Sequence, residues 1–169
     1  MLPLLVVCLS ACQPTLNWRE ARPEGAGVAV LFPCKPDVEQ RPARPGQGAM
    51  GLARCEAGGL NFALSWADLP DPGKSPAALQ AMPRALAAKL GQPLPAPQPL
   101  QVAGMTPLPD AGNYRIAGIE GGTGVTRVAV FAHGVRVYQV LMAGRQDDAA
   151  TWDAWVSSLR VGAALRPAG

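Results

Sequence analysis

Hydrophobic and polar residues alternate along much of this chain with the period of two that is typical of β-strands. The alternating segments predict strands at residues 28–32, 50–56, 60–66, 113–120, 125–132 and 135–142, with a shorter strand at 100–103. Glycine-containing turns such as Ala57-Gly58-Gly59 and His133-Gly134 separate neighbouring segments. Because such turns suit tight hairpins, we expect consecutive strands to pair antiparallel.

Two further segments repeat hydrophobic residues at the helical period of about 3.6. The first segment carries Leu79, Met82, Leu86 and Leu90, and the second carries Trp152, Trp155, Val156 and Leu159. Ser75-Pro76 offers an N-cap and a proline at the first helical position, and Asp147 and Asp148 are candidate caps for the second helix. Pro83 lies inside the first segment and removes one backbone hydrogen bond, so we expect that helix to be kinked or split there.

Strands in two runs, with one helix between the runs and one after them, predict an α+β domain. We expect a mostly antiparallel sheet of about six to seven strands with a mid-chain helix and a C-terminal helix. Residues 35–48 are rich in proline, glycine and arginine and are expected to form a surface loop. Residues 27–161 are expected to form a single domain, and residues 162–169 a disordered tail.

The first residues of the chain contain a short apolar run, residues 4–9, that ends beside small residues. A membrane-spanning helix needs about 20 apolar residues, so the run is typical of an export signal instead. Leu9-Ser10-Ala11-Cys12 resembles the lipobox of bacterial lipoproteins. The resemblance implies that residues 1–11 are removed as a signal peptide and that Cys12 carries lipid. Residues 12–26 would then be a flexible tether between the lipid and the domain.

Two details qualify this interpretation. Cys8 follows two valines and does not fit the pattern of small residues before the cleavage site. A basic residue is missing before the apolar run, so we expect the true start of the protein to lie upstream. The alternative interpretation of this segment is a buried N-terminal strand.

The lipobox resemblance also implies a location in the cell envelope, with the domain facing the periplasm. Gln13 follows the lipid cysteine, and the aspartate that is familiar in inner-membrane lipoproteins is absent. Outer-membrane placement is therefore expected over the inner membrane. The expected partners are the membrane, through the N-terminal lipid, and an envelope protein.

The charge of the chain argues against nucleic acid as a partner. The net charge of +3 comes from 15 basic and 12 acidic residues without a basic run, so we expect no nucleic-acid partner.

With Cys8 removed and Cys12 acylated, Cys34 and Cys55 remain, and an oxidising compartment favours their disulfide. A redox-active thiol pair or a metal site is the alternative. The pair lacks Cys-x-x-Cys spacing, and two cysteines with one histidine supply few ligands, so no metal ion or cofactor is expected.

Few residues offer catalytic chemistry. His133 is the one histidine and the only general base for a Ser-His-Asp enzyme, but it lies at an expected hairpin tip, where a wet and mobile turn residue is the simpler interpretation. Ser65 and Ser75 lie outside any Gly-x-Ser-x-Gly elbow. Gly121-Gly122-Thr123-Gly124 is followed by a strand, which favours a hairpin turn over a phosphate loop. No catalytic residue is therefore assigned.

Aromatic residues provide two further hypotheses. Trp66, Trp152 and Trp155 could line a small-molecule pocket, although their spacing favours core packing. Arg136 and Tyr138 share one face of the last predicted hairpin, which we expect to be exposed. Because arginine and tyrosine are enriched at protein interfaces, this face is the candidate interface.

Four short segments resemble the PsbP/DcrB-like pattern. They are Phe32-Pro33, Ala67-Asp68-Leu69-Pro70, Gly134-Val135-Arg136-Val137-Tyr138 and Val156-Ser157-Ser158-Leu159-Arg160-Val161. The resemblance spans nearly the whole domain, although Cys34 and Cys55 are not part of the pattern. It implies an antiparallel sheet flanked by helices and a lipid-tethered or extrinsic assembly or binding module without catalysis.

The leading hypothesis is thus a lipid-anchored, non-catalytic scaffold or binding module of the cell envelope. One alternative is an envelope thiol-redox protein or hydrolase that uses Cys34 and Cys55, or His133. Another alternative is a small-ligand carrier, which would need an apolar cavity beneath Trp152 and Trp155.

Overall fold

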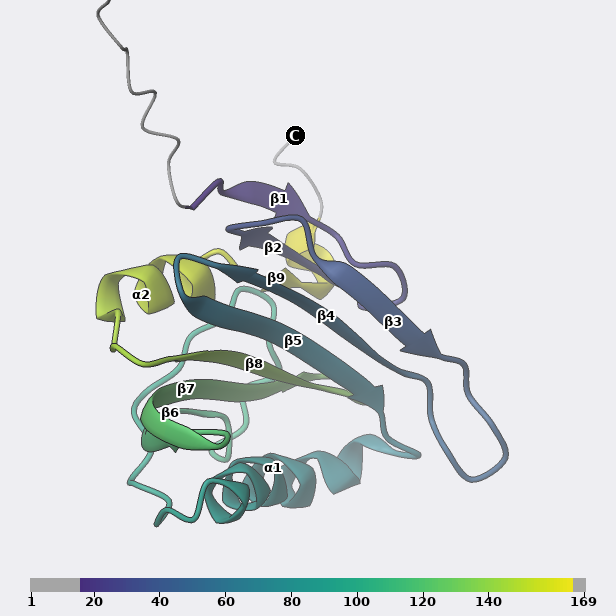
Figure 1. Ribbon diagram of the computed structural model, residues 1–169. Helices are drawn as coiled ribbons and strands as arrows, with labels where there is room; N and C mark the ends of the chain where they lie inside the picture. The colour runs from purple at the N-terminus through teal and green to yellow at the C-terminus, as the bar shows by residue number, and fades with distance from the viewer. Residues whose placement is uncertain (1–15, 166–169) are drawn as a thin grey trace, which may run out of the picture.

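The computed structural model describes residues 16–165 (Figure 1). Cys12 and the proposed signal peptide at residues 1–11 lie outside the described residues. The strands are β1 (Arg19–Ala21), β2 (Val28–Phe32), β3 (Asp37–Arg41), β4 (Met50–Ala57), β5 (Leu60–Asp68), β6 (Gly112–Ile119), β7 (Gly122–His133), β8 (Arg136–Gly144) and β9 (Arg160–Val161). The helices are the short 3-10 helix η1 (Pro72–Lys74), α1 (Ser75–Lys89), α2 (Ala149–Ser157) and the 3-10 helix η2 (Gly162–Leu165).

The strands form two antiparallel sheets, which confirms the predicted α+β class. The large sheet has six strands in the order β3-β4-β5-β8-β7-β6, and the small sheet has the order β1-β2-β9. The hairpins predicted from alternation are present, since β5 pairs with β4, and β7 pairs with both β6 and β8. The pairing of β5 with β8 joins the two halves of the chain.

One helix lies on each face of the large sheet (Figure 1). On one face, α2 and β2 cover a core that includes Phe32, Phe62 and Trp155. On the other face, α1 packs on β7 and β8, where Leu79 and Val128 belong to a second core. The sheet is therefore buried on both faces near β7 and β8.

Helix α1 continues through Pro83 to Lys89 as one element, so the proline does not split it. Leu79, Pro83 and Ala87 are buried at successive intervals of four residues, on the side of the helix that packs on the sheet. This packing offsets the backbone hydrogen bond that the proline cannot make. The predicted N-cap is wrong by one residue: Lys74 is the N-cap, Ser75 is the first helical residue, and Pro76 still lies in the first turn.

Two predictions about strands are wrong. Residues 35–48, expected to be a loop, contain β3, whose five side chains are all exposed. Polar residues on both faces hide a strand from a hydrophobic pattern, and β3 is held by backbone pairing with β4 at the edge of the sheet. Residues 100–103 form no strand, and Ala103 makes only an isolated bridge to Arg160.

The expected tether and tail are also more ordered than predicted over the described residues. Within residues 12–26, the strand β1 pairs with β2, and Trp18 packs edge-on against Phe62 at 6.3 Å between ring centroids. Of the predicted tail, Gly162–Leu165 forms η2 directly after β9, whereas residues 166–169 lie outside the described residues. Backbone pairing with the small sheet orders both ends, which hydrophobicity alone did not indicate.

No helix among residues 16–165 is both long and apolar enough to cross a lipid bilayer.

Candidate functional site

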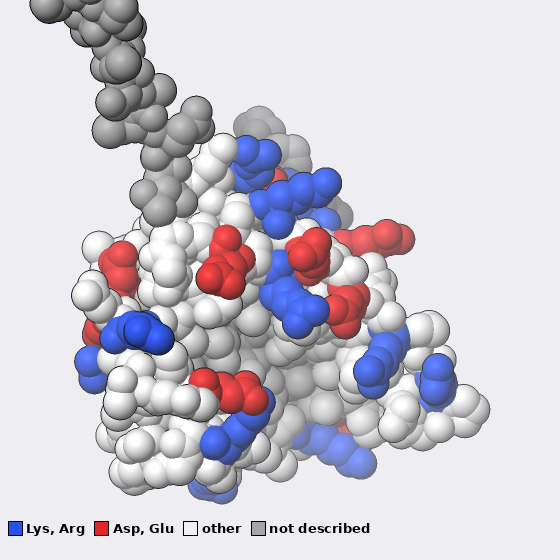
Figure 2. All heavy atoms as spheres, in the orientation of Figure 1, with Lys and Arg blue, Asp and Glu red and all other residues white. Residues whose placement is uncertain are grey.

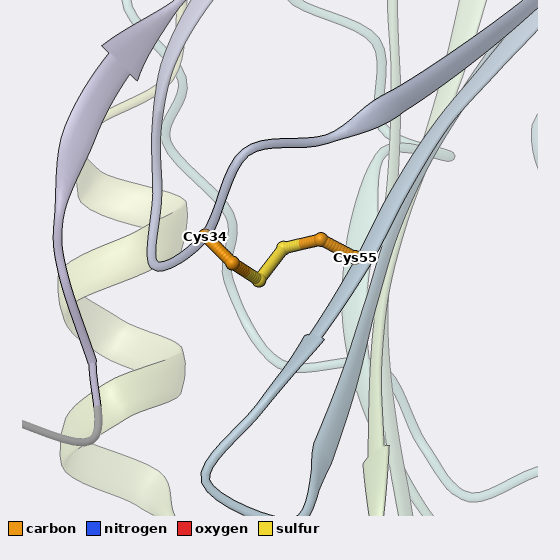
Figure 3. The surroundings of a disulfide bond; sticks show 2 residues. All are labelled: Cys34 and Cys55. Atoms are coloured by element: carbon orange, nitrogen blue, oxygen red, sulfur yellow. A yellow bond between two sulfur atoms is a disulfide. The ribbon is translucent and has the colours of Figure 1, made fainter.

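Cys34 and Cys55 form a disulfide, as predicted (Figure 3). Cys34 follows β2 of the small sheet, and Cys55 lies on β4 of the large sheet, with their Cα atoms 6.0 Å apart. Cys55 is half-buried against the core beneath α2. The bond therefore fixes the small sheet to the outer part of the large one.

His133 is held at the end of β7 and is not a mobile hairpin tip. Its Nδ1–H donates to the carbonyl oxygen of Gly104 at 2.8 Å. The ring also lies so close to Gly162 that a Cβ atom added there would overlap it. The exposed tip consists of Gly134 and Val135 instead. His133 therefore fixes a loop and the start of η2 to the large sheet, which is a structural role.

The expectation of an exposed face at Arg136 is wrong. Arg136 pairs with Asp68 across β5 and β8, and its Nε and Nη2 donate to the two carboxylate oxygens at 2.6 and 2.8 Å. Its Nη1 donates to the carbonyl oxygen of Gly25. The hydrogen bonds to the Asp68 carboxylate stabilise the charged guanidinium and raise the pKa of Arg136, although burial opposes the shift.

Tyr138 is buried, so it also offers no exposed contact surface. Its hydroxyl donates to the carbonyl oxygen of Ala26 at 2.9 Å, and its ring stacks on Phe131. Burial raises the pKa of Tyr138 to about 12, against the lowering effect of neighbouring Arg136. Arg136 and Tyr138 thus attach the segment before β2 to β8 and are not available as the interface that the sequence suggested.

The tryptophans are core residues, the interpretation that their spacing favoured. Trp152 and Trp155 are fully buried and meet edge to face at 6.1 Å between ring centroids. Trp155 makes the same kind of contact with Phe32 and Phe62. Aromatic side chains therefore occupy the space in which a carrier would need a cavity.

A hollow that sequence reasoning missed lies on the opposite face of the sheet. Helix α1 covers β7 and β8, and the sheet continues beyond it through β5, β4 and β3. The resulting groove has a volume of about 580 Å³. We call it the α1–β5 groove; its lining includes Met50, Leu52, Ser65, Ala67, Ala81 and Met82. Figure 2 shows the hollowed, largely uncharged surface between the strands and α1.

Small side chains create this groove. Ser65 and Ala67 point from β5 towards the α1 side of the sheet and are only half-buried. The alternate residues Leu64 and Trp66 fill the opposite core. The sequence does show that β5 has large residues on one face and small residues on the other. This pattern indicates a groove only when the position of α1 is known.

Charged residues border the groove at β3 and also line a neighbouring hollow. Glu39 and Arg41 of β3 line one end, and Glu39 forms an ion pair with Arg54 at 2.9 Å. A second hollow of about 360 Å³ follows further along α1, where Lys89 and Glu120 form an ion pair at 2.9 Å. Within residues 16–165, Arg41 has no acidic partner in an ion pair.

The described residues contain no cluster of three or more histidine, cysteine, aspartate or glutamate side chains suited to a metal ion. No protein-family model matches the sequence, and no curated protein matches it. The resemblances to the lipobox and to the PsbP/DcrB-like pattern therefore depend on the residues that carry them.

Proposed function

We propose that this chain is a bacterial envelope lipoprotein, anchored through lipid on Cys12, whose domain is a non-catalytic scaffold or binding module. The observation that carries the proposal is Leu9-Ser10-Ala11-Cys12, placed shortly before the first strand at Arg19. Seven residues of extended chain span at most about 25 Å, so the domain would lie close to the membrane. Gln13 after the lipid cysteine favours the periplasmic side of the outer membrane.

The disulfide supports an exported protein. Structural disulfides persist in oxidising compartments such as the bacterial periplasm and are rare in the cytosol. Cys34 and Cys55 are bonded to each other and join two sheets. A bond in this position suits a stabilising cross-link better than a thiol pair that cycles.

The contacts of the candidate chemical groups support a binding role over catalysis. His133 Nδ1–H is committed to Gly104, and Arg136 is committed to Asp68 and Gly25. The antiparallel sheet with a helix on each face is the architecture that the PsbP/DcrB-like resemblance implies. Such modules act through their surfaces, and the α1–β5 groove is a surface of this kind.

Two matched cysteine substitutions test the anchor in the producing bacterium. Cys12→Ala should abolish incorporation of labelled palmitate and move the protein from the membrane fraction to the soluble fraction. Cys8→Ala should leave both properties unchanged, because Cys8 lies outside the lipobox. Equal behaviour of the two variants would contradict the anchor.

Thiol labelling separates a binding module from a thiol-redox protein. On the proposal, Cys34 and Cys55 stay unlabelled in cells and after mild glutathione treatment, since structural disulfides resist that reductant. A substantial reduced fraction that reoxidises in the envelope would favour the redox alternative.

A further inference from the structure

We propose that the α1–β5 groove binds a single-chain amphiphile, with its acyl chain along the groove floor and its anionic head group beside Arg41. The inference deepens the proposed function, because it names the ligand of the binding module. The groove supplies three independent features: an apolar floor, a small volume and a positive end.

The floor is apolar and accessible. Met50 is 40 % exposed on β4, and the half-buried Leu52 and Met82 continue the apolar surface across the groove to α1. Methionine side chains adapt to ligands of irregular shape and are frequent at permissive binding surfaces. Apolar side chains gathered in a groove, and not scattered singly over the surface, are typical of ligand-binding grooves.

The volume suits a thin ligand. A volume of about 580 Å³ lies within the range of small-molecule sites, about 300–1,000 Å³. An α-helix with side chains is about 10–12 Å across, so the same volume holds about one helical turn. A partner helix binds through side chains spaced over two turns or more, so it would need a longer groove. The size therefore favours a small molecule over a docked helix.

The groove also has a direction. On α1, Ala78, Ala81 and Met82 line the first hollow, and Leu86 and Leu90 line the second. The two hollows therefore follow one another along the helix from Ala78 to Leu90, a rise of about 18 Å at 1.5 Å per residue. A flexible hydrocarbon chain can follow apolar side chains in this order, with about 0.8 kcal/mol gained per buried CH₂ group.

The end of the groove at β3 is positive. Arg54 neutralises Glu39, while Arg41 has no acidic partner among the described residues. Arg44 follows in the β3–β4 loop, and no acidic residue occurs between Glu39 and Glu56. In Figure 2 basic side chains predominate on the lobe to the right, where Figure 1 shows that loop. A guanidinium binds carboxylate or phosphate oxygens in pairs, so this end complements an anionic head group.

Titration calorimetry with the full chain carrying Cys12→Ala, purified with its disulfide intact, tests the inference without competing anchor lipid. The probes are palmitate, lysophosphatidylglycerol and lysophosphatidylcholine, each below its micellar concentration. We expect at least one anionic probe to bind with 1:1 stoichiometry, and the tighter of the two identifies a carboxylate or a phosphodiester head. The zwitterionic probe should bind about tenfold more weakly, because its quaternary ammonium offsets the phosphate charge that faces Arg41. Failure of both anionic probes to bind, or equal binding of the zwitterionic probe, would overturn the inference.

Matched variants locate the site. Ala81→Phe fills the groove and should weaken binding at least about tenfold, because the chain loses its place on the floor. Ala88→Phe, at an exposed position of the same helix that lines neither hollow, should bind like the parent. Arg41→Gln should remove the preference for anionic probes, whereas Arg145→Gln should keep it. Equal affinities within either pair would overturn the assignment.

Sedimentation of the same samples tests whether a second copy of the chain occupies the groove. A dimer that Ala81→Phe dissociates, without binding of any probe, would assign the groove to a second copy of the chain and contradict a ligand site. Palmitate incorporation at Cys12 measures the lipid anchor in a separate experiment. Loss of probe binding therefore leaves the proposed lipoprotein intact, and loss of acylation leaves the groove measurement valid.

Discussion

Arg136 on β8 and Asp68 on β5 form a two-pronged ion pair at the end of the strand pairing that joins the two halves of the large sheet. Both side chains are about three-quarters buried, and Arg136 also bonds the carbonyl oxygen of Gly25. One guanidinium therefore connects β5, β8 and the segment that leads into β2.

Loss of this guanidinium should destabilise the domain. Arg136→Gln leaves a largely buried carboxylate and a carbonyl oxygen without their partner, so we expect the free energy of unfolding to decrease by about 2–3 kcal/mol. Arg54→Gln removes a guanidinium from the exposed pair with Glu39 and should cost less than about 1 kcal/mol. Urea unfolding of both variants measures the difference, and equal losses would contradict the structural role of Arg136.

The contact between His133 and Gly162 gives a second comparison. Gly162 and Gly134 have the same positive φ of 59°, but only Gly162 has a neighbour, the His133 ring, in the space of a new Cβ atom. Gly162→Ala should therefore lower the free energy of unfolding by about 1–2 kcal/mol more than Gly134→Ala, because the ring must move and its bond to Gly104 weakens. Thermal or urea unfolding checks this, and an equal loss in both variants would count against the contact.

The disulfide should contribute substantially to stability. Cys34 and Cys55 are 21 positions apart, and a loop of this size gives about 3 kcal/mol in the chain-entropy model. We expect the double variant Cys34→Ser, Cys55→Ser to lose that amount in urea unfolding. Dithiothreitol should destabilise the parent to the same level and leave the double variant unchanged. A parent that is insensitive to reductant would show that the bond is not the stabilising element.

Asp147 should make stability depend on acid pH. It accepts hydrogen bonds from Arg127 at 2.6 and 2.9 Å and from Arg115 at 2.7 Å. These bonds, that from Arg127 foremost, lower the pKa of Asp147 from 3.8 to about 2 although burial opposes the shift. The folded pKa is the lower one, so the stabilisation is present above about pH 4 and is lost as the pH falls towards 2.

The size of this effect is moderate, because the carboxylate is partly exposed and its ion pairs are screened. We expect Asp147→Asn to cost about 1 kcal/mol at neutral pH. The difference from the parent should shrink as the pH falls from about 4 through about 2, because the folded carboxyl of Asp147 becomes protonated over that range. Urea unfolding across this range measures it, and a difference that does not change with pH would contradict the assigned ion pairs.

Much of the fold was predictable because hydrophobic alternation is a local property. Residues Leu60 to Trp66 place large apolar side chains on one face, and this face is buried as expected. The strand β3 was not predictable in this way, since its side chains are exposed on both faces and only backbone pairing with β4 holds it. The same reason applies to β1, which pairs with β2.

The candidate interface shows why the site was harder to predict than the fold. Arg136 and Tyr138 share a face, as the period of two requires, but the segment at Gly25 and Ala26 covers that face from more than a hundred positions earlier in the chain. No local pattern indicates such a cover. The α1–β5 groove was missed for a related reason, because it results from small side chains and from where α1 ends its contact with the sheet.

Intact mass spectrometry of the protein purified from its native membrane, with crosslinking to identify its neighbours, is the direct test of the lipid anchor. We expect a chain that begins at Cys12, carries the mass of its acyl chains, retains the Cys34–Cys55 bond and crosslinks to envelope components. A full-length, unacylated chain that still contains residues 1–11 and crosslinks to cytosolic proteins would contradict it.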